Sequence, residues 1–416
     1  MRDLLVVGGG PAGAATATWA ARAGLDVLLV ERERFPRHKA CAEYLSPEAA
    51  RDLDDLGVLA EVEERAARLW GFRIVADDGA QARGRFPDDA RAYRRYGLAL
   101  PRAHFDALVL RAARRAGVEV REGVALEALT SEDGVVTGAV LRPAGPPALP
   151  GGSRAEGMGR HTERARVVVG ADGLNSLVAR RLGLARRLGP ARVALVAHFA
   201  GVEGMSEYGE MFVGRGRYIG LAGLDPDGPG RLVNVAAVVA RDAVRGAGLG
   251  RDPGAFLRDV VAGFPELERR LRHARLVREV LVAGPFARAA RRSVADGALL
   301  VGDAADFFDP FTGEGIFAAL RGGRLAARAV AAALARGEAS AAALAPYRRA
   351  RRRAFLGKWA FERVAGLAAT RPALMRRFAR RMASHPAALG RWLGAAGDYV
   401  PPVELLAPRS LAALFL

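Results

Sequence analysis

The chain has 416 residues, of which 51% are hydrophobic, and a formal net charge of +18. This length and composition allow a large core shared by two intertwined domains. The single cysteine, Cys41, excludes an internal disulfide and favours a reducing, cytoplasmic setting. We expect neither a transmembrane helix nor a signal peptide, because no apolar run is long enough to span a bilayer and Met1 leads directly into a strand pattern.

The positive charge comes almost wholly from arginine. Arginine and alanine are abundant together, which a GC-rich coding sequence would explain by itself. A basic chain can also bind nucleic acid, anionic lipid or an acidic substrate. No basic segment has the aromatic interleaving of a nucleic-acid module, so we expect no nucleic-acid partner.

The first thirty residues predict a β-α-β unit. Residues 3–7 form an apolar run typical of a buried parallel strand, and an Ala-rich helix at 11–23 precedes a second strand at 26–30. Further elements are expected as a helix at 100–116, strands at 117–120, 124–129 and 298–301, a short buried strand at 167–169, and a long helix at 315–336. Residues 143–165 are rich in Pro and Gly and predict an exposed excursion between strands.

A second sheet is indicated by alternating apolar and polar residues. The pattern covers residues 192–199, 209–223 and 231–240, which we interpret as antiparallel strands with one buried face. Residues 253–272 and the last eighty residues predict helices.

A G-x-G-x-x-G motif at Gly8, Gly10 and Gly13 follows the first strand and opens the first helix. In this context the motif is typical of dinucleotide binding, with a tight turn at Gly8, backbone approach to a pyrophosphate at Gly10 and close packing at Gly13. The helix N-terminus would add free N–H groups and a positive dipole end. Glu31, at the end of the second strand, is placed to bind ribose hydroxyls.

Three later segments favour FAD over NAD. They are Gly170-Ala171-Asp172-Gly173, Val301-Gly302-Asp303-Ala304-Ala305 and Asp309-Pro310-Phe311-Thr312-Gly313-Glu314-Gly315-Ile316. A further segment bears on the family branch and runs from Phe35 to Pro47, with Arg37, Lys39, Cys41 and Glu43. With these segments the chain resembles the FAD-dependent oxidoreductases that have the para-hydroxybenzoate hydroxylase type of fold. Within them it is most similar to the geranylgeranyl reductase-like branch, over roughly residues 3 to 345.

The branch assignment depends on the last turn and on the Cys41 segment. Aromatic hydroxylases of this fold typically carry a His after Gly-Asp-Ala-Ala and a Gln between the two later glycines, whereas this chain has Asp306 and Glu314. Relatives usually have Gly after the cysteine, where this chain has Ala42. This departure concerns the detailed conformation of the loop more than its location near the flavin.

The resemblance implies roles for particular residues. Asp172 would support the cofactor loop, Asp303 would accept a hydrogen bond from the ribityl chain, and Gly313 and Gly315 would let backbone N–H groups approach the flavin pyrimidine. Arg102, at a helix start, would touch FAD, although a solvated cap is the ordinary alternative. The full predicted cofactor set is Gly8, Gly10, Pro11, Ala12, Gly13, Glu31, Arg32, Arg37, Lys39, Arg102, Asp172, Gly302, Asp303, Pro310, Gly313, Glu314, Gly315 and Ile316.

Cys41 and Glu43 are the candidate catalytic residues, because by this resemblance they would line the active site. A single cysteine is more often a small buried hydrophobe, so that alternative stays open. None of the six histidines stands at metal-ligand spacing, and we expect no metal site. His198 lies on a predicted strand of the second sheet, where a core or surface role is the expectation over a substrate-facing one.

The segment from 348 to 381 has twelve Lys or Arg against one acid, Glu362, with interleaved apolar residues. This pattern is typical of amphipathic helices. Their apolar sides would pack on the body of the protein or, alternatively, make peripheral contact with an anionic membrane surface.

We therefore expect an α/β fold with a split Rossmann-type FAD-binding domain from residues 1–70, 100–190 and 280–345. An antiparallel substrate-domain sheet would come from 71–99 and 191–279, and a basic helical C-terminal tail from 346–416. No second Rossmann motif is present, so the electron donor would be NAD(P)H docking transiently or a reduced carrier such as ferredoxin or a flavin reductase.

The expected function is that of an FAD-dependent oxidoreductase acting on a hydrophobic, isoprenoid- or polyketide-like substrate. The leading reaction is reduction of a carbon–carbon double bond, as the branch implies, and the alternative is monooxygenation of an aromatic or polyketide product. A non-catalytic flavin protein at a lipid surface is a third interpretation. The Trp-x-Trp-x-Ile-Pro signature of flavin halogenases and the G-x-S-x-G elbow of hydrolases are absent.

Overall fold

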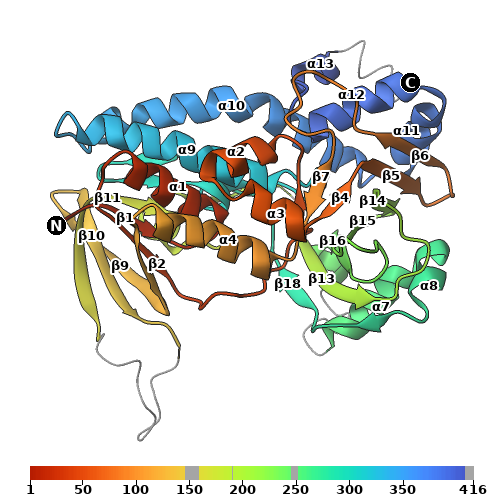
Figure 1. The fold of residues 1–416 in the computed structure, drawn as a ribbon, viewed down its shortest axis with the longest axis horizontal. Coiled ribbons are helices and arrows are strands. Elements are labelled where there is room, and N and C mark those ends of the chain that lie inside the picture. Colours follow the sequence, from red (N-terminus) through yellow and green to blue (C-terminus); the bar gives the residue numbers. More distant parts are fainter. Residues whose placement is uncertain (146–158, 190, 245–251, 408–416) are drawn as a thin grey trace, which may run out of the picture.

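The computed structural model describes residues 1–145, 159–189, 191–244 and 252–407. Figure 1 shows two sheets side by side, with helices α1, α2, α4, α9 and α10 over the N-terminal one and α7 and α8 beneath the other. The hairpin of β9 (Val124–Glu132) and β10 (Val135–Pro143) projects from the N-terminal half. Among the described residues no helix is long and apolar enough to cross a membrane.

The N-terminal sheet is assembled from segments far apart in the sequence. Its order is β20-β21-β11-β1-β2-β8, and β1 pairs in parallel with both β2 and β11. The strands are β1 (Arg2–Val7), β2 (Val27–Glu31), β8 (Glu119–Glu122), β11 (His161–Gly170), β20 (Val294–Ala295) and β21 (Ala298–Leu300). Strands β1, β11 and β21 run parallel and therefore end at the same sheet edge, where their loops converge.

Both faces of this sheet are buried, which explains its nearly continuous apolar strands. Leu4 and Val6 pack against the helices, whereas Leu5 and Val7 pack against β9, β10 and α5 (Leu177–Arg181). The covering helices are α1 (Pro11–Arg22), α2 (Ala49–Leu56), α3 (Leu59–Arg65), α4 (Arg102–Arg115) and α9 (Gly315–Leu334). Helices α1 and α9 approach closely, because a Cβ on Gly323 would lie 2.9 Å from the Ala12 carbonyl oxygen.

The second sheet has the order β17-β13-β16-β15-β14-β5-β6, with β18 also paired to β13. Its strands are β5 (Gly71–Ala76), β6 (Gln81–Arg85), β13 (Arg192–Ala200), β14 (Gly209–Gly214), β15 (Arg217–Gly223), β16 (Val233–Ala240), β17 (Arg275–Leu276) and β18 (Leu281–Ala283). Residues alternate between its faces. Leu195 packs against α7 (Pro253–Ala262) and α8 (Pro265–Leu271), whereas Ala194 and Val196 face the opposite side.

The C-terminal helices are α10 (Ala341–Ala368), α11 (Pro372–Ser384), α12 (Pro386–Ala396) and α13 (Val403–Leu406). Helix α10 packs along α9, and α11 and α12 cover β5 and β6. Two small three-stranded sheets complete the fold. One consists of β3 (Tyr44–Leu45), β7 (Gly97–Ala99) and β4 (Ala67–Leu69), and the other of β12 (Ala185–Arg187), β19 (Arg288–Ala290) and β22 (Asp306–Phe307). The C-terminal region is thus packed onto both larger sheets.

The predicted fold class is confirmed, and one predicted segment needs correction. Strand β11 begins at His161, so the end of the expected excursion at 143–165 is strand, and the predicted strand 167–169 is the end of a longer one. The Pro and Gly signals stop before His161, and exposed polar residues hide the strand pattern there. Residues 146–158 lie outside the described residues. The division into three domains stays a prediction.

Candidate functional site

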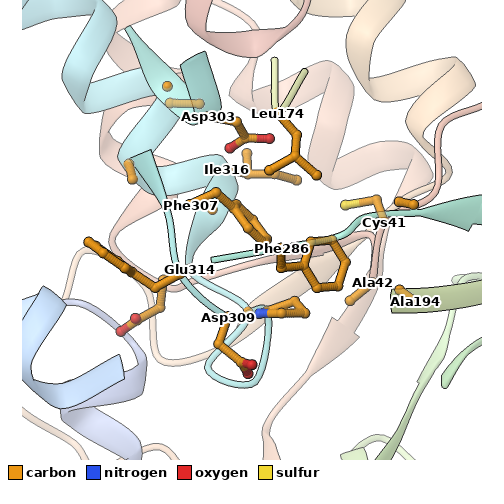
Figure 2. A pocket seen from close by; sticks show the side chains of 18 of the residues that line it. Cys41, Ala42, Leu174, Ala194, Phe286, Asp303, Phe307, Asp309, Glu314 and Ile316 are labelled. Atoms are coloured by element: carbon orange, nitrogen blue, oxygen red, sulfur yellow. The ribbon is translucent and has the colours of Figure 1, made fainter. Parts of the chain in front are cut away.

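A pocket lies where the loops after β1, β11 and β21 meet the start of α9 and one face of the second sheet. It is lined by Gly10, Pro11, Ala12, Lys39, Cys41, Arg102, Gly302, Asp303, Pro310, Gly313, Glu314, Gly315 and Ile316 from the predicted set. Figure 2 shows its interior, with Asp303 and Ile316 at one side, Asp309 at the opposite side, and Phe286 and Phe307 between the two sides. Segments from four parts of the sequence therefore share one cavity.

The glycine loop after β1 has the geometry of a phosphate cradle. A Cβ on Gly8, whose φ is +108°, would lie 2.5 Å from the Ala171 carbonyl oxygen, and one on Gly13 would lie 1.9 Å from that of Gly8. A Cβ on Gly10 would meet only the Arg37 guanidinium, at 3.7 Å. The first and third glycines are therefore required by packing, whereas Gly10 leaves its backbone open to the pocket, as bound dinucleotide phosphates require.

Glu31 and Asp172 hold the loops around this cradle. Glu31 accepts a hydrogen bond from the Gly9 amide through Oε2 at 2.7 Å and is itself buried. Asp172 accepts from the Ser176 hydroxyl at 2.5 Å and from the Leu177 amide at 2.6 Å, and burial raises the pKa of its carboxyl group. Neither acid lines the pocket, and neither do Gly8, Gly13, Arg32, Arg37 and Glu43 from the predicted set; of these, Arg32 has an exposed side chain.

Arg102 lines the pocket from the first turn of α4. Its guanidinium donates two hydrogen bonds to Asp106, from Nε at 2.6 Å and from Nη2 at 2.8 Å. Arg37 also lies 2.9 Å from Asp106, whose side chain is fully buried. Asp106 therefore fixes two of the predicted cofactor residues. Sequence reasoning missed it, although its i,i+4 spacing from Arg102 on a helix signals such a pair.

Lys39 and Asp303 face the pocket from opposite loops. Burial, together with the nearby Arg102, lowers the pKa of the Lys39 amine, and burial raises the pKa of the Asp303 carboxyl group. The chain has only two lysines, Lys39 and Lys358, and both line this pocket. In a protein that otherwise uses arginine, this indicates positions that need a compact ammonium group.

Cys41 lines the pocket, and Glu43 lies behind it. Glu43 has φ +60°, unusual for a residue other than glycine, and its carboxylate accepts a hydrogen bond from the Arg102 amide at 3.0 Å. Its other oxygen lies 2.7 Å from Nε2 of His198, and both side chains are buried. Asn234 donates to the Cys41 carbonyl oxygen at 2.9 Å. Glu43 thus joins the Cys41 loop to α4 and β13 rather than projecting into the cavity.

Glu314 takes part in the pocket in a way the sequence did not indicate. Its carboxylate accepts from the Thr312 hydroxyl at 2.8 Å and lies 3.2 Å from the Lys358 ammonium, which also pairs with Asp398 at 2.7 Å. All three charged groups are buried. Burial raises the pKa of both carboxyl groups, and the two acids raise the pKa of Lys358 to about 12 despite its burial.

One face of α10 forms part of the pocket wall. It contributes Arg351, Lys358, Trp359 and Glu362. Arg351 pairs with Asp306 at 2.6 Å, and Asp309 pairs with Arg192 and accepts from the Tyr218 hydroxyl at 2.8 Å. The sequence analysis missed these α10 residues because it interpreted residues 348–381 only as basic amphipathic helices. No local sequence signal indicates which face of a helix meets a distant loop.

The remaining wall is apolar and comes from the second sheet. Apart from Tyr218, its residues are small or aliphatic: Ala194, Val196, Met211, Gly220, Ala236, Val238 and Ala283. Phe286 and Phe307 lie with ring centroids 5.1 Å apart beside this wall. Within the described residues no group of three or more His, Cys, Asp or Glu could hold a metal ion. The arrangement is a polar nucleotide cradle opening onto an apolar chamber.

Comparison with known proteins agrees with this geometry. The FAD binding domain family model matches residues 1–358. The chain is 31% identical to a digeranylgeranylglycerophospholipid reductase of Methanosarcina acetivorans over 352 residues, covering 81% of this chain and 77% of the relative. It is 32% identical to that of Methanosarcina mazei over 350 residues, with the same coverages.

Solved structures share the fold. A geranylgeranyl bacteriochlorophyll reductase-like protein from Thermoplasma acidophilum aligns with a TM-score of 0.78 at 22% identity, covering 99% of this chain and 98% of that one. A flavin-dependent brominase aligns with a TM-score of 0.79 at 20% identity, covering 96% and 94%. The cradle, its chamber and the family match lead to one assignment: the chain belongs to the FAD binding domain family and is an FAD-dependent oxidoreductase.

Proposed function

We propose that the protein reduces a carbon–carbon double bond in a hydrophobic, isoprenoid- or polyketide-like substrate. The observation that carries the proposal is the continuity of one pocket from the Gly10 loop to the apolar face of β13 and β16. Such continuity would place an extended apolar chain against the flavin. The likeness to curated reductases at about 30% identity supports the same reaction.

The residues of this chain would hold FAD in three places. The Gly10–Ala12 backbone at the start of α1 would bind the pyrophosphate, where the helix dipole favours negative charge. Asp303, with Lys39 and Arg102 nearby, would bind the ribityl and phosphate groups. The Gly313–Gly315 turn at the start of α9 would bind the pyrimidine edge. When bound and reduced by the electron donor, FAD would supply the hydride for one carbon of the double bond, and a proton would add to the other carbon.

The chamber walls would orient the substrate and exclude water. The small side chains of Ala194, Ala236 and Ala283 leave room above the sheet, and Phe286 and Phe307 would pack along an apolar chain. Cys41 lies at the junction of cradle and chamber and would contact the reacting region. Glu43 would act as a positioning residue for the Cys41 loop, through Arg102 and His198.

The electron donor would be NAD(P)H docking transiently or a reduced carrier protein, since the sequence has a single dinucleotide motif. Peripheral membrane contact is also proposed, but on a smaller surface than the sequence suggested. Phe355, Phe361 and Phe378 are buried in the protein, whereas Leu356 and Leu367 are exposed on α10 between arginines. These two leucines would be the apolar contacts with an anionic lipid surface.

Monooxygenation remains the second candidate because the same cradle serves both chemistries. The experiment is a single-turnover assay in which the FAD-loaded protein is reduced anaerobically and mixed with a geranylgeranyl lipid, with or without oxygen. The mass of the product then distinguishes reduction from monooxygenation. A gain of two hydrogen atoms per double bond without oxygen supports the reductase, whereas insertion of an oxygen atom only in air would replace it by the monooxygenase.

A further inference from the structure

The chamber is apolar along the second sheet but carries an excess of acid at the α10 end. Asp306, Asp309, Glu314 and Glu362 line this end, together with two cations, Arg351 and Lys358. Both cations are already engaged. Arg351 lies 2.6 Å from Asp306, and Lys358 lies 2.7 Å from Asp398 and 3.2 Å from Glu314.

Glu362 differs from the other acids of this end. No hydrogen bond or ion pair joins it to any described residue, although it lines the cavity one turn beyond Lys358 on α10. Asp309, by contrast, is paired with Arg192 and Tyr218. The α10 end of the chamber therefore holds a carboxylate with free acceptor oxygens and, among the described residues, no uncommitted cation.

A phosphate group would find no suitable partners at this end. Proteins bind phosphate through arginine, lysine or clustered N–H groups, and a carboxylate in a partly dehydrated site repels it. A hydroxyl group, in contrast, would donate a hydrogen bond to the free Glu362 oxygens at little cost. The chamber is thus matched to an apolar chain with an uncharged polar end.

We propose that the substrate enters this chamber as a neutral, hydroxyl-bearing apolar chain, with the hydroxyl bound at Glu362, and that anionic phospho-headgroups are rejected there. This inference rests on the proposed function and deepens it by naming the substrate class. It also distinguishes this chain from the digeranylgeranylglycerophospholipid reductases, whose name denotes a phospholipid substrate.

The rejection of anionic phospho-headgroups at Glu362 should depend on pH. Burial and the neighbouring Asp306, Asp398 and Asp309 raise the pKa of Glu362 to about 7, and Lys358 on the same helix opposes them. Below this pH the carboxyl group is neutral and repels phosphate less. Above it the charge is present, so discrimination against phosphate increases as pH rises through 7.

The test is direct binding of two tritiated probes, geranylgeraniol and geranylgeranyl monophosphate, to the FAD-loaded protein by equilibrium dialysis at low ionic strength. At pH 8 geranylgeraniol should bind at least about tenfold more tightly than geranylgeranyl monophosphate. In Glu362→Gln this preference should fall severalfold, because the isosteric amide removes the charge. Glu132→Gln, at an exposed position on the β9–β10 hairpin, is the matched control and should retain the full preference.

Equal or tighter binding of the monophosphate by the wild-type protein would overturn the inference. So would an unchanged preference in Glu362→Gln, or failure of the alcohol to bind. Since only binding is measured, these outcomes are separate from the reductase proposal, which the product mass decides.

Discussion

The two ends of the pocket are built by different means. The cofactor end is shaped mainly by backbone, with Gly8 and Gly13 packed so closely that a methyl group would not fit. The α10 end is shaped by side chains from distant segments, where Lys358 joins Glu314 and Asp398. The first kind of site is specified by short local motifs, whereas the second exists only when the chain is folded.

The largest expected effect comes from breaking the charged network of the α10 end. Lys358→Met would leave Glu314 and Asp398 buried without their cation, and loss of one partner from a buried ion pair costs about 3–5 kcal/mol. Chemical denaturation measures the free energy of unfolding. Arg353→Met, at an exposed position on the same helix, is the control. A loss equal to that of the control would show that the network is solvated.

Glu362→Gln should stabilise the protein at high pH. The folded-state pKa of about 7 lies above the value of an unfolded chain, so the folded form binds the extra proton and loses stability as pH rises towards and through 7. The glutamine removes this loss. At pH 8 we expect the free energy of unfolding of Glu362→Gln to exceed that of the wild type by about 2 kcal/mol, a value kept modest because the Glu362 side chain is only half-buried. Near pH 4 we expect almost no difference between the two proteins. A gain that does not vary with pH would contradict this explanation.

At the cofactor end, Gly13→Ala should reduce FAD affinity more than about tenfold. The added Cβ would displace the Gly8 carbonyl group and so distort the glycine loop that binds the phosphates. Flavin absorbance of the purified protein gives the cofactor content. Gly159→Ala, where a Cβ meets nothing within 4 Å, is the matched control. Full flavin content in Gly13→Ala would mean that the loop does not form the phosphate site.

The smallest effect concerns Cys41, the single cysteine. Since it lines the pocket, FAD loading should slow its alkylation by iodoacetamide severalfold relative to the FAD-free protein. Mass spectrometry of the intact chain follows the reaction. Equal rates with and without FAD would place the thiol outside the cofactor's reach.

The difference between the cofactor end, built from local motifs, and the α10 end, built from distant side chains, explains how much the sequence could predict. The pocket residues Gly10 and Asp303 lie in short motifs directly after β1 and β21, and the parallel pairing of β1, β11 and β21 brings these loops together, whereas Gly313 lies in a short motif at the start of α9. Asp106 was accessible from its helical spacing to Arg102 but was overlooked. Lys358 was not accessible, because its partners Glu314 and Asp398 lie 44 and 40 residues away in the sequence. Glu362 was not accessible either, because only the packing of α10 brings it to the pocket wall.

His198 and Glu43 illustrate the same limit. The expectation of a core or surface role for His198 agrees with its burial, but its partner is 155 residues away. Glu43 appeared as a candidate active-site residue by resemblance, and the structure places its carboxylate behind the wall, against Arg102 and His198. A sequence motif gives the location of a loop more reliably than the direction of each side chain.

The central claim is that one continuous pocket holds FAD and an apolar substrate in contact. The most direct measurement is the flavin difference spectrum of the FAD-loaded protein titrated with geranylgeraniol, compared between the wild type and Ala236→Trp, which fills the sheet side of the chamber. We predict a saturable shift in the wild type and none in the variant, with equal flavin content. A wild-type spectrum that stays unchanged while the alcohol binds, or an equal shift in both proteins, would contradict the claim.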